Sequence, residues 1–348
     1  MRAHTPLSLL LAAALMGLLA ITGCSSDSDE ELVIYTGRSQ ALVEPLVEQF
    51  RAEYDVPIKV RYGSDAQMLA ALAEEGDRSP ADVFWANTTG ALGNAAQDDR
   101  LRTLPDDILD LPDFFVPGSA QWVPLTARFR VLAYNTDRVD PDDLPDSILD
   151  LPEHDELEDR LGWTPTYSSF QDFITALRHT ESDEAASNWI SDMRTNLSPN
   201  NYSSNTPIIQ ALDAEEIDVG LTNHYYVLRL RYGDHRVDDD EIEPDAPVDI
   251  YRFADGDVGN LALVTGAGLL DTGTQPDAAE DFLRLLLNEE AQSFSAETLN
   301  EYPVIEGIEV PSYMLSVEEA LRGSPDFDME RLHDIDATLN LLRDQGLL

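Results

Sequence analysis

Short apolar segments alternate along the chain with segments whose apolar residues recur at helical spacing. Residues 32–36 predict a buried strand, and 37–54 predict an amphipathic helix with Ser39 as its N-cap. Further strands are predicted at 58–63, 81–87, 131–136, 161–166, 218–223 and 261–270, and further helices at 65–76, 169–178, 207–214, 276–294 and 328–344. This alternation is typical of α/β proteins, in which helices cover both faces of mostly parallel sheets.

Two segments complicate this pattern. Pro45 lies inside the helix predicted at 37–54, where it costs least if the helix begins a few residues after Ser39. The stretch 137–160 is acidic and rich in proline, which predicts a surface loop with one short helix.

The first 24 residues, MRAHTPLSLLLAAALMGLLAITGC, are predicted to lie outside the fold. A basic start and an apolar run predict a secretory signal peptide over 1–23. The run is shorter than the ~20 apolar residues of a membrane span. Its end resembles the bacterial lipobox, so we expect Cys24, the only cysteine, to carry a lipid anchor and to form no disulfide. Residues 24–31 then form a short charged tether.

Acidic residues dominate the composition. Asp and Glu number 67 against 22 Lys and Arg, which gives a net charge of −45, and Lys59 is the only lysine. The acidic residues are dispersed along the chain, and their repulsion is damped where the Debye length falls to about 3 Å, near 1 M salt. The composition therefore predicts a halophilic protein, with a general acidic bias as the alternative. It argues against nucleic acid as a partner, because phosphates would be repelled.

Polar residues next to the ends of the predicted strands are the candidates for a binding site, because parallel sheets bind ligands beyond the carboxyl ends of their strands. They are Arg38, Ser39, Asn87, Thr88, Tyr167, Ser168, Ser169, Asn205, Asn223, His224, Tyr225 and Tyr226, with Arg128 and Arg130 just ahead of the strand at 131–136. None of them is acidic. We therefore expect acidic groups to stay out of the cleft and the ligand to include an anion.

The adjacent pair Tyr225 and Tyr226 has the chemistry of a metal site. Neighbouring residues at a helix start lie about 100° apart around the axis, so both phenols can converge on one ion. A phenol with a pKa of about 10 is a poor ligand for most metals. A hard trivalent cation stabilises the phenolate enough to displace the proton. Packing in the core or at its rim is the alternative, and His224 is expected to be a turn or supporting residue.

A second group lies at the start of the helix predicted at 169–178. Ser168 or Ser169 is expected to cap this helix, and its N–H groups together with the hydroxyls can hold an anion. An ordinary N-cap is the alternative. Tyr167 can reach the same cleft as a third phenolate. Motifs of enzymes are missing from the sequence, which has no P-loop, no HExxH and no GxSxG, so we expect no catalytic activity.

Several stretches together resemble the ferric-ion-binding, substrate-binding proteins of bacterial ABC iron importers, which are similar to transferrin in cleft chemistry. They are LVIYTGRSQALVEPLVEQF, LAEEGDRSPADVFWAN, TARFRVLAYNTDRV, GWTPTYSSFQDFITAL, NTPIIQALDAEEIDVGLTNHYY, LVTGAGLL and LNEYPV. The resemblance implies a type II periplasmic-binding-protein fold, with two α/β lobes joined by a hinge of crossover strands. We expect one lobe at 32–130 plus 256–306 and the other at 131–255 plus 307–348.

The resemblance also implies a ligand set. Tyr225 and Tyr226 match the family's iron-binding pair, with Tyr167 as a third ligand, and Fe³⁺ is the transported ligand. A carbonate- or phosphate-like anion would rest on Ser168, Ser169, Asn205, Asn223 and Arg130. Ser39 and Asn87 stand where the best-known members have histidine and glutamate, so they are expected to line the cleft with Arg38 rather than to bind iron.

The implied function is capture without chemistry. A monomer, held by its lipid anchor on the periplasmic side of the cell envelope, would close over Fe³⁺ and deliver it to an ABC permease. A binding protein for thiamine, a polyamine or an oxyanion is the first alternative, although polyamine sites need carboxylates that the strand ends lack. A lipid-anchored enzyme is the second, and it would need a nucleophile–base pair or a closed metal shell.

Overall fold

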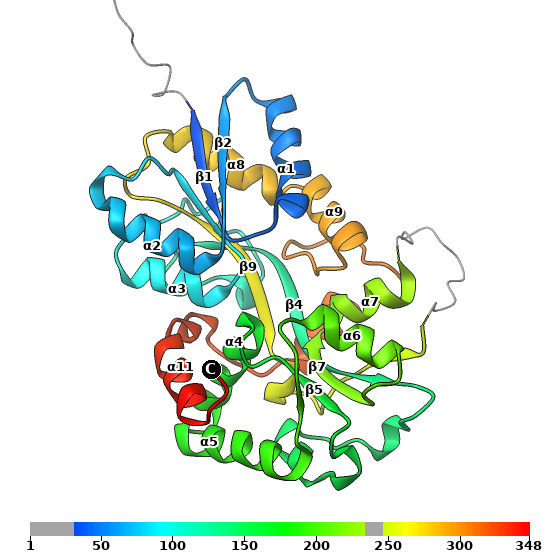
Figure 1. Ribbon diagram of the computed structural model, residues 1–348. Coiled ribbons are helices and arrows are strands. Elements are labelled where there is room, and N and C mark those ends of the chain that lie inside the picture. The colour runs from blue at the N-terminus through cyan, green and yellow to red at the C-terminus, as the bar shows by residue number, and fades with distance from the viewer. Residues whose placement is uncertain (1–30, 234–245) are drawn as a thin grey trace, which may run out of the picture.

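The computed structural model describes residues 31–233 and 246–348, so the predicted signal peptide, Cys24 and nearly all of the tether lie outside the described residues (Figure 1). Hydrogen-bonded strands follow the order β2-β1-β3-β9-β4-β7-β5-β6, with β8 paired to β4. The strands are β1 (Leu32–Thr36), β2 (Ile58–Tyr62), β3 (Val83–Ala86), β4 (Val123–Asn135), β5 (Leu161–Trp163), β6 (Asn200–Asn201), β7 (Val219–Asn223), β8 (Val248–Tyr251) and β9 (Ala262–Leu269).

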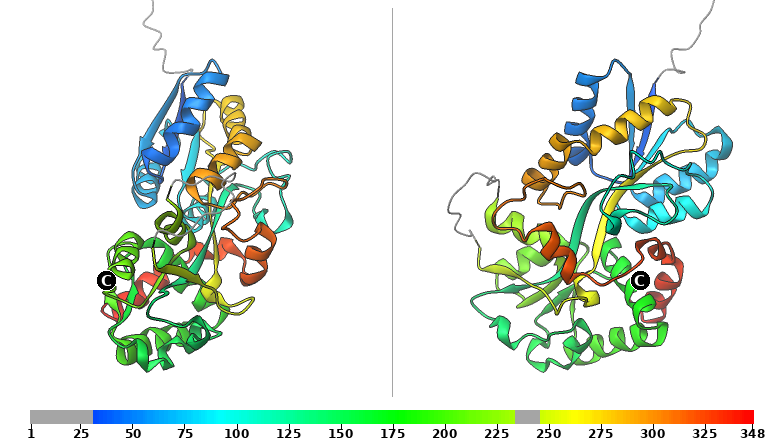
Figure 2. Two further views of the ribbon diagram at one scale, coloured as in Figure 1. Left: turned by 90° about the vertical axis from the view of Figure 1, so that its right-hand side faces the viewer. Right: turned by 180° about the vertical axis from the view of Figure 1, so that it is seen from behind.

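Two groups of strands form two lobes, and β4 runs through both (Figures 1 and 2). In the first lobe β1 pairs in parallel with β2 and β3, and in the second lobe β5 pairs in parallel with β6 and β7. The start of β4 pairs antiparallel with β9, and its end pairs antiparallel with β7 and β8. The predicted architecture of two α/β lobes joined by crossover strands is confirmed, with parallel pairing in the outer parts of each lobe.

Helices flank the sheet in both lobes. The α-helices are α1 (Gln40–Glu53), α2 (Asp65–Glu75), α3 (Thr89–Gln97), α4 (Ser168–Thr180), α5 (Asp183–Asp192), α6 (Asn205–Asp213), α7 (His224–Tyr232), α8 (Pro276–Leu286), α9 (Glu289–Leu299), α10 (Val317–Gly323) and α11 (Ile335–Asp344). Short 3₁₀ helices are η2 (Gly76–Arg78), η3 (Asp113–Phe115), η4 (Pro141–Asp143), η5 (Ile148–Glu153), η6 (Asp155–Leu157), η8 (Val258–Asn260) and η9 (Met329–His333), and η7 (Met193–Leu197) is a π-helix. Within the described residues, no helix has the length and apolar character needed to cross a membrane.

Each predicted strand is present, but β4 begins at Val123, well before the predicted start at 131. Its first half alternates apolar residues with Pro124 and polar residues, which is also a strand pattern, but it lacks the continuous apolar run that predicted the strand at 131–136. The helix predicted at 276–294 is two helices, α8 and α9. They are separated at Asn288, whose side chain accepts a hydrogen bond from the Ala291 N–H at 2.8 Å and so begins a new helix.

Two predicted segments differ in local detail from the expectation. α1 begins directly after Ser39, so Pro45 lies in its interior and leaves one helical hydrogen bond unmade. Ser39 occupies the N-cap position, but its side chain makes no capping bond. The stretch 137–160 contains η4, η5 and η6 rather than one short helix. Most of it is exposed, as predicted for a surface segment, and Leu149 is exposed too. Leu144, Ile148, Leu151 and Leu157 are buried and hold it against the core of the second lobe.

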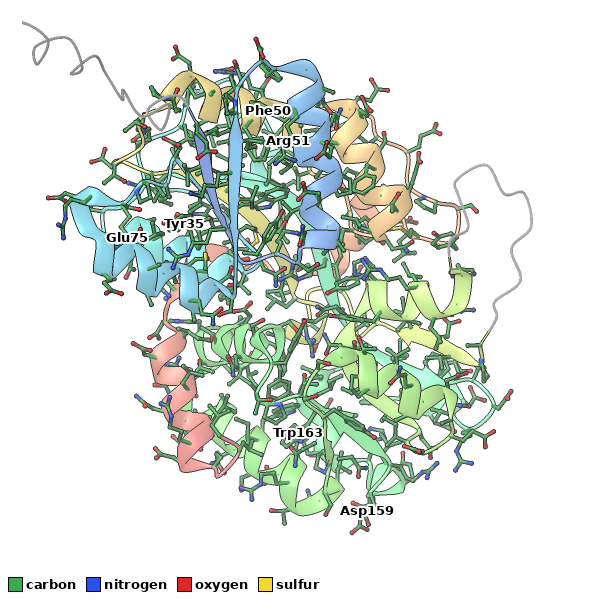
Figure 3. The ribbon with its side chains drawn as sticks, turned by 45° about the horizontal axis from the view of Figure 1, so that its top comes forward. Tyr35, Phe50, Arg51, Glu75, Asp159 and Trp163 are labelled. Carbon is green, nitrogen blue, oxygen red and sulfur yellow. The ribbon has the colours of Figure 1, made fainter. Side chains whose placement is uncertain are left out.

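Aromatic side chains fill the core of each lobe. In the first lobe Phe282 makes edge-to-face contacts with Phe50 and Trp85, and in the second lobe Phe170 does so with Trp163. Figure 3 shows Phe50 in the first lobe and Trp163 in the second, on opposite sides of the junction. Because each lobe has its own apolar core, the two can act as rigid halves about the strands that connect them.

Candidate metal- and anion-binding cleft

The structure brings together the three tyrosines that the sequence analysis selected. β7 ends at Asn223, the N-cap of α7, so Tyr225 and Tyr226 lie in the first turn of that helix. Their rings are stacked, with centroids 4.3 Å apart and planes at 30°. Tyr167 precedes α4, and its hydroxyl lies 3.1 Å from that of Tyr226. Phenolic oxygens from α7 and from the start of α4 therefore meet at one point.

Burial makes these phenols hold their protons. Desolvation raises the pKa of Tyr225, although the Arg128 guanidinium opposes the shift. Desolvation also raises the pKa of Tyr226, and the neighbouring Tyr225 and Tyr167 raise it further. Both phenols are therefore neutral near pH 7 in the ion-free protein, and only a strongly polarising cation can displace their protons.

Two buried arginines on β4 face the same region. Arg130 is 2% exposed; its Nη1 donates hydrogen bonds to Ser169 Oγ at 3.3 Å and to Asn223 Oδ1 at 3.0 Å. Arg128 donates from Nη2 to the Asn87 carbonyl at 2.6 Å. Burial lowers the pKa of Arg130 to about 10 despite the opposing effect of Tyr225, so the guanidinium stays charged at neutral pH. The cleft therefore contains a fixed positive charge beside the phenols.

The predicted anion residues form one polar network around Arg130. Tyr167 is the N-cap of α4, so the expectation that Ser168 or Ser169 caps this helix was wrong, and both serines lie in its first turn. The Asn205 amide nitrogen is 3.5 Å from the Ser169 hydroxyl oxygen. Asn205 Oδ1 is buried and has no hydrogen-bond partner among the described residues. Ser168 lies beside this network and lines an adjacent cavity. Hydroxyls, amides, a guanidinium and the N–H groups of a helix start together suit an anion.

The residues predicted from the first lobe are arranged differently. Arg38 is buried and its Nη2 lies 3.1 Å from a carboxylate oxygen of Glu301, which also accepts from the Thr126 hydroxyl. Its charge is therefore neutralised beneath the crossover strands. Ser39 is exposed at the start of α1. Asn87 takes part through its backbone, since its carbonyl accepts from Arg128 and its N–H donates to Asp65 Oδ1 at 2.9 Å.

A cavity of about 270 Å³ lies between the two lobes and contains acidic groups. Its lining comes from segments of both lobes and includes Asn87, Thr88, Ser168, Gln171, Asp65 and Asp172. The expectation that acidic groups stay out of the cleft is therefore wrong. Sequence reasoning missed both aspartates, although Asp65 follows the strand at 58–63 by two residues and Asp172 lies one helical turn after Ser168.

His224 has a supporting role. Its Nδ1 accepts the Phe129 N–H at 3.1 Å, and its Nε2 lies 2.9 Å from the Asn300 carbonyl, to which it donates. Burial lowers the pKa of His224 to about 4, so the ring is neutral. Both ring nitrogens are thus engaged in holding α7 to β4 and to the segment after α9, and neither is available to a metal ion.

A metal ion in this cleft would depend on phenolic oxygens. Across residues 31–233 and 246–348, no three His, Cys, Asp or Glu side chains come together in a way that could hold a metal ion. The meeting point of Tyr167, Tyr225 and Tyr226 beside the Arg130 network offers a different donor set, of hard oxygens.

Known proteins share this sequence and architecture. The family described as bacterial extracellular solute-binding protein matches residues 35–293. A Fe(3+)-binding periplasmic protein of Serratia marcescens is 26% identical over 344 residues, covering 97% of this chain and 96% of its own. The major ferric iron-binding protein of Neisseria meningitidis serogroup B is 28% identical over 298 residues, covering 85% of each.

A solved structure agrees with these relatives. Iron-bound HitA from Pseudomonas aeruginosa superposes with a TM-score of 0.80 at 28% identity, over 91% of this chain and 99% of its own. The resemblance to ferric-ion-binding proteins and the two-lobed periplasmic-binding-protein fold are therefore confirmed. The chain belongs to the bacterial extracellular solute-binding proteins.

Proposed function

We propose that this protein captures Fe³⁺ together with an anion in the cleft between its lobes and delivers it to an ABC permease. The meeting of the Tyr167, Tyr225 and Tyr226 oxygens beside the buried Arg130 network carries the proposal. Iron-binding relatives from Serratia and Neisseria support it, as does the iron-bound Pseudomonas structure. The protein acts by binding and closure, without catalysis.

Capture follows from the chemistry of the tyrosines. The ion enters, displaces the phenolic protons, and is held by phenolate oxygens whose negative charge balances its own. The hydroxyls of Tyr167 and Tyr226 already lie 3.1 Å apart, close enough for one ion to contact both. Tyr167 supplies the third phenolate in a cleft where Ser39 and Asn87 are not iron ligands.

The anion completes the coordination and is held by the second lobe together with Arg130 of the crossover strand β4. Arg130, Ser168, Ser169, Asn205 and Asn223 supply charge, hydroxyls and amides to a carbonate- or phosphate-like group. Closure then occurs about β4 and β9, which connect the lobes. We assign 32–130 plus 256–306 to one lobe and 131–255 plus 307–348 to the other.

The protein works outside the cytoplasmic membrane. It belongs to a family of extracellular solute-binding proteins, which supports a signal peptide over 1–23 and a lipid anchor at Cys24. We propose a monomer that is adapted to high salt by its net charge of −45. A melting temperature that does not rise between about 0.1 M and about 2 M NaCl would contradict this adaptation.

One titration tests the proposed function. Ferric ion is added to the purified protein with and without carbonate, and absorbance is followed for the visible band of a ferric phenolate. The expected result is a band that saturates at one ion and is weaker in Tyr226→Phe. A protein that shows no band, but gives heat of binding with thiamine, a polyamine or an oxyanion alone, would favour those ligands instead.

A further inference from the structure

We infer that Asp172 determines the charge of the anion that the cleft accepts, favouring a singly charged anion over a doubly charged one. This inference rests on the proposed function, because it concerns the anion subsite around Arg130. It makes Asp172 a specificity-determining residue that is not itself a metal ligand.

The position of Asp172 supports this role. It lies on α4, three residues after Ser169, and is 3% exposed. Its Oδ2 atom has no hydrogen-bond partner within the described parts of the chain. The side chain lines the 270 Å³ cavity between the lobes together with Ser168 and Gln171. A buried carboxylate oxygen without a donor is costly, and burial raises the pKa of Asp172 to about 7; above that pH the charge is held by electrostatic attraction.

That attraction comes from the two arginines of the cleft. Arg128 and Arg130 both attract Asp172, whereas Asp65 repels it. Among the other acidic groups near the arginines, Glu301 is already paired with Arg38, and burial raises the pKa values of Tyr225 and Tyr226 so that both are neutral. Without a ligand, the negative charge available to balance Arg128 and Arg130 is chiefly that of Asp172, supplemented by Asp65.

Asp65 is a weaker candidate for selecting the ligand, because its oxygens are already used. One accepts the Asn87 N–H at 2.9 Å and the other accepts the Thr88 hydroxyl at 2.7 Å. These bonds hold the turn after β3 in place. Asp172 has no such bonds on Oδ2 among the described residues, so its charge can act on an anion that binds at the same arginines.

An anion bound at Arg130 must share the positive charge with Asp172. Each negative charge on the anion is repelled by the carboxylate, and the repulsion is strong because the site is buried and poorly screened. A dianion therefore loses more affinity than a monoanion. Replacing Asp172 by an uncharged residue of the same shape should therefore remove the extra loss of affinity that a dianion suffers relative to a monoanion.

Calorimetric titration of the iron-free protein with acetate and with sulfate, at about pH 8 and constant ionic strength, tests this inference, because Asp172 is charged at that pH. Asp172→Asn is expected to raise sulfate affinity by about tenfold more than acetate affinity. Glu181→Gln is the matched control, because it removes the same charge from the exposed end of α4 and leaves both affinities unchanged. An unchanged ratio of sulfate to acetate affinity in Asp172→Asn, or no binding of either anion in any variant, overturns the inference.

Two further readouts keep the inference separate from folding and from the proposed function. If Asp172→Asn does not fold, the wild-type protein decides: tighter binding of acetate than of sulfate supports the inference, and the reverse overturns it. The ferric phenolate band is measured on the same preparations. A missing band contradicts iron capture, but the ratio of sulfate to acetate affinity still tests the role of Asp172. A normal band together with the same affinity ratio in Asp172→Asn and in the wild-type protein contradicts the role of Asp172 and leaves iron capture standing.

Discussion

The two lobes present different chemistry to the cleft. The second lobe presents side-chain hydroxyls and amides, namely those of Tyr167, Ser169 and Asn223 at the starts of α4 and α7. The first lobe presents Asn87 through its backbone and keeps Arg38 in a buried ion pair with Glu301. The charge of Arg38 is neutralised by Glu301, whereas the second-lobe groups bond to one another and to Arg130, whose charge no described carboxylate pairs with at salt-bridge distance. The comparison indicates that the second lobe holds the ligand and the first lobe encloses it.

The crossover strand β4 connects these two roles. Arg128 reaches the Asn87 carbonyl of the first lobe, and Arg130 reaches Ser169 and Asn223 of the second. The two arginines are two residues apart on one strand, so their side chains emerge on the same face. A movement about β4 therefore changes the surroundings of both charges at once.

The largest effect is expected from removing phenol oxygens of the second lobe. Tyr225→Phe combined with Tyr226→Phe should lower ferric affinity by more than the about 10–100-fold typical of residues that only support a ligand. The measurement is competition with a coloured chelator. Tyr54→Phe is the control, because its ring stacks on Phe50 in the core of the first lobe, away from the cluster. Equal affinity in the double variant and the control would place the iron elsewhere.

Acidification should have the next largest effect. The pKa values of Tyr225 and Tyr226 are raised by burial, so both phenols are protonated in the ion-free protein throughout the neutral range. Iron binding then releases protons, and affinity falls as pH falls, by about tenfold per pH unit for each phenol ionised. Competition titrations at several pH values measure this slope. Tyr226→Phe should show a shallower slope, and an identical slope would mean that Tyr226 does not ionise.

Loss of the positive charge on β4 should have a smaller effect. Arg130→Gln removes charge-assisted hydrogen bonds worth about 1.5–3 kcal/mol each, so iron binding should weaken and lose its dependence on added carbonate. Arg130→Lys keeps the charge but not the paired geometry, so its ferric affinity should lie between those of the wild-type protein and of Arg130→Gln. Exposed Arg343→Gln serves as the control for a lost charge. Full carbonate dependence in Arg130→Gln would show that the anion binds at another place.

The smallest effect is expected in the first lobe. Asn87→Ala keeps the backbone carbonyl and N–H that bond to Arg128 and Asp65, so ferric affinity should change by no more than about threefold. Ferric affinity is again measured by competition with a coloured chelator. A loss of ferric affinity comparable to that of Tyr226→Phe would mean that both lobes contribute ligands. It would contradict the conclusion that the second lobe holds the ligand and the first lobe only encloses it.

Much of the fold could be predicted from local pattern. The strands at 32–36 and 218–223 coincide closely with β1 and β7, because buried apolar runs bounded by polar residues identify short strands. The helices α3, α5 and α10 and the strands β6 and β8 were not predicted. Small residues in α3 and the shortness of β6, with only two residues, left no periodic signal.

The candidate site was predictable in part. Tyr225, Tyr226 and Ser169 were found because they follow strands, and strand ends in such sheets face the ligand. Arg130 was found by its place beside a strand. Asp172 was missed because it lies inside a helix, and only the packing of α4 shows that it faces two arginines. The roles of these residues in binding remain predictions.

The sequence by itself determined which segments form strands and helices, which residues stand at the strand ends, and how acidic the surface is, because these depend on local composition and spacing. Only the tertiary structure decided which of those charges are neutralised by a carboxylate and which join the polar network of the cleft. Arg38 and Arg130 both lie next to predicted strands, yet one is neutralised by Glu301 and the other is hydrogen-bonded to Ser169 and Asn223. Their partners lie far away in the chain, so the two arginines were indistinguishable until the chain was folded.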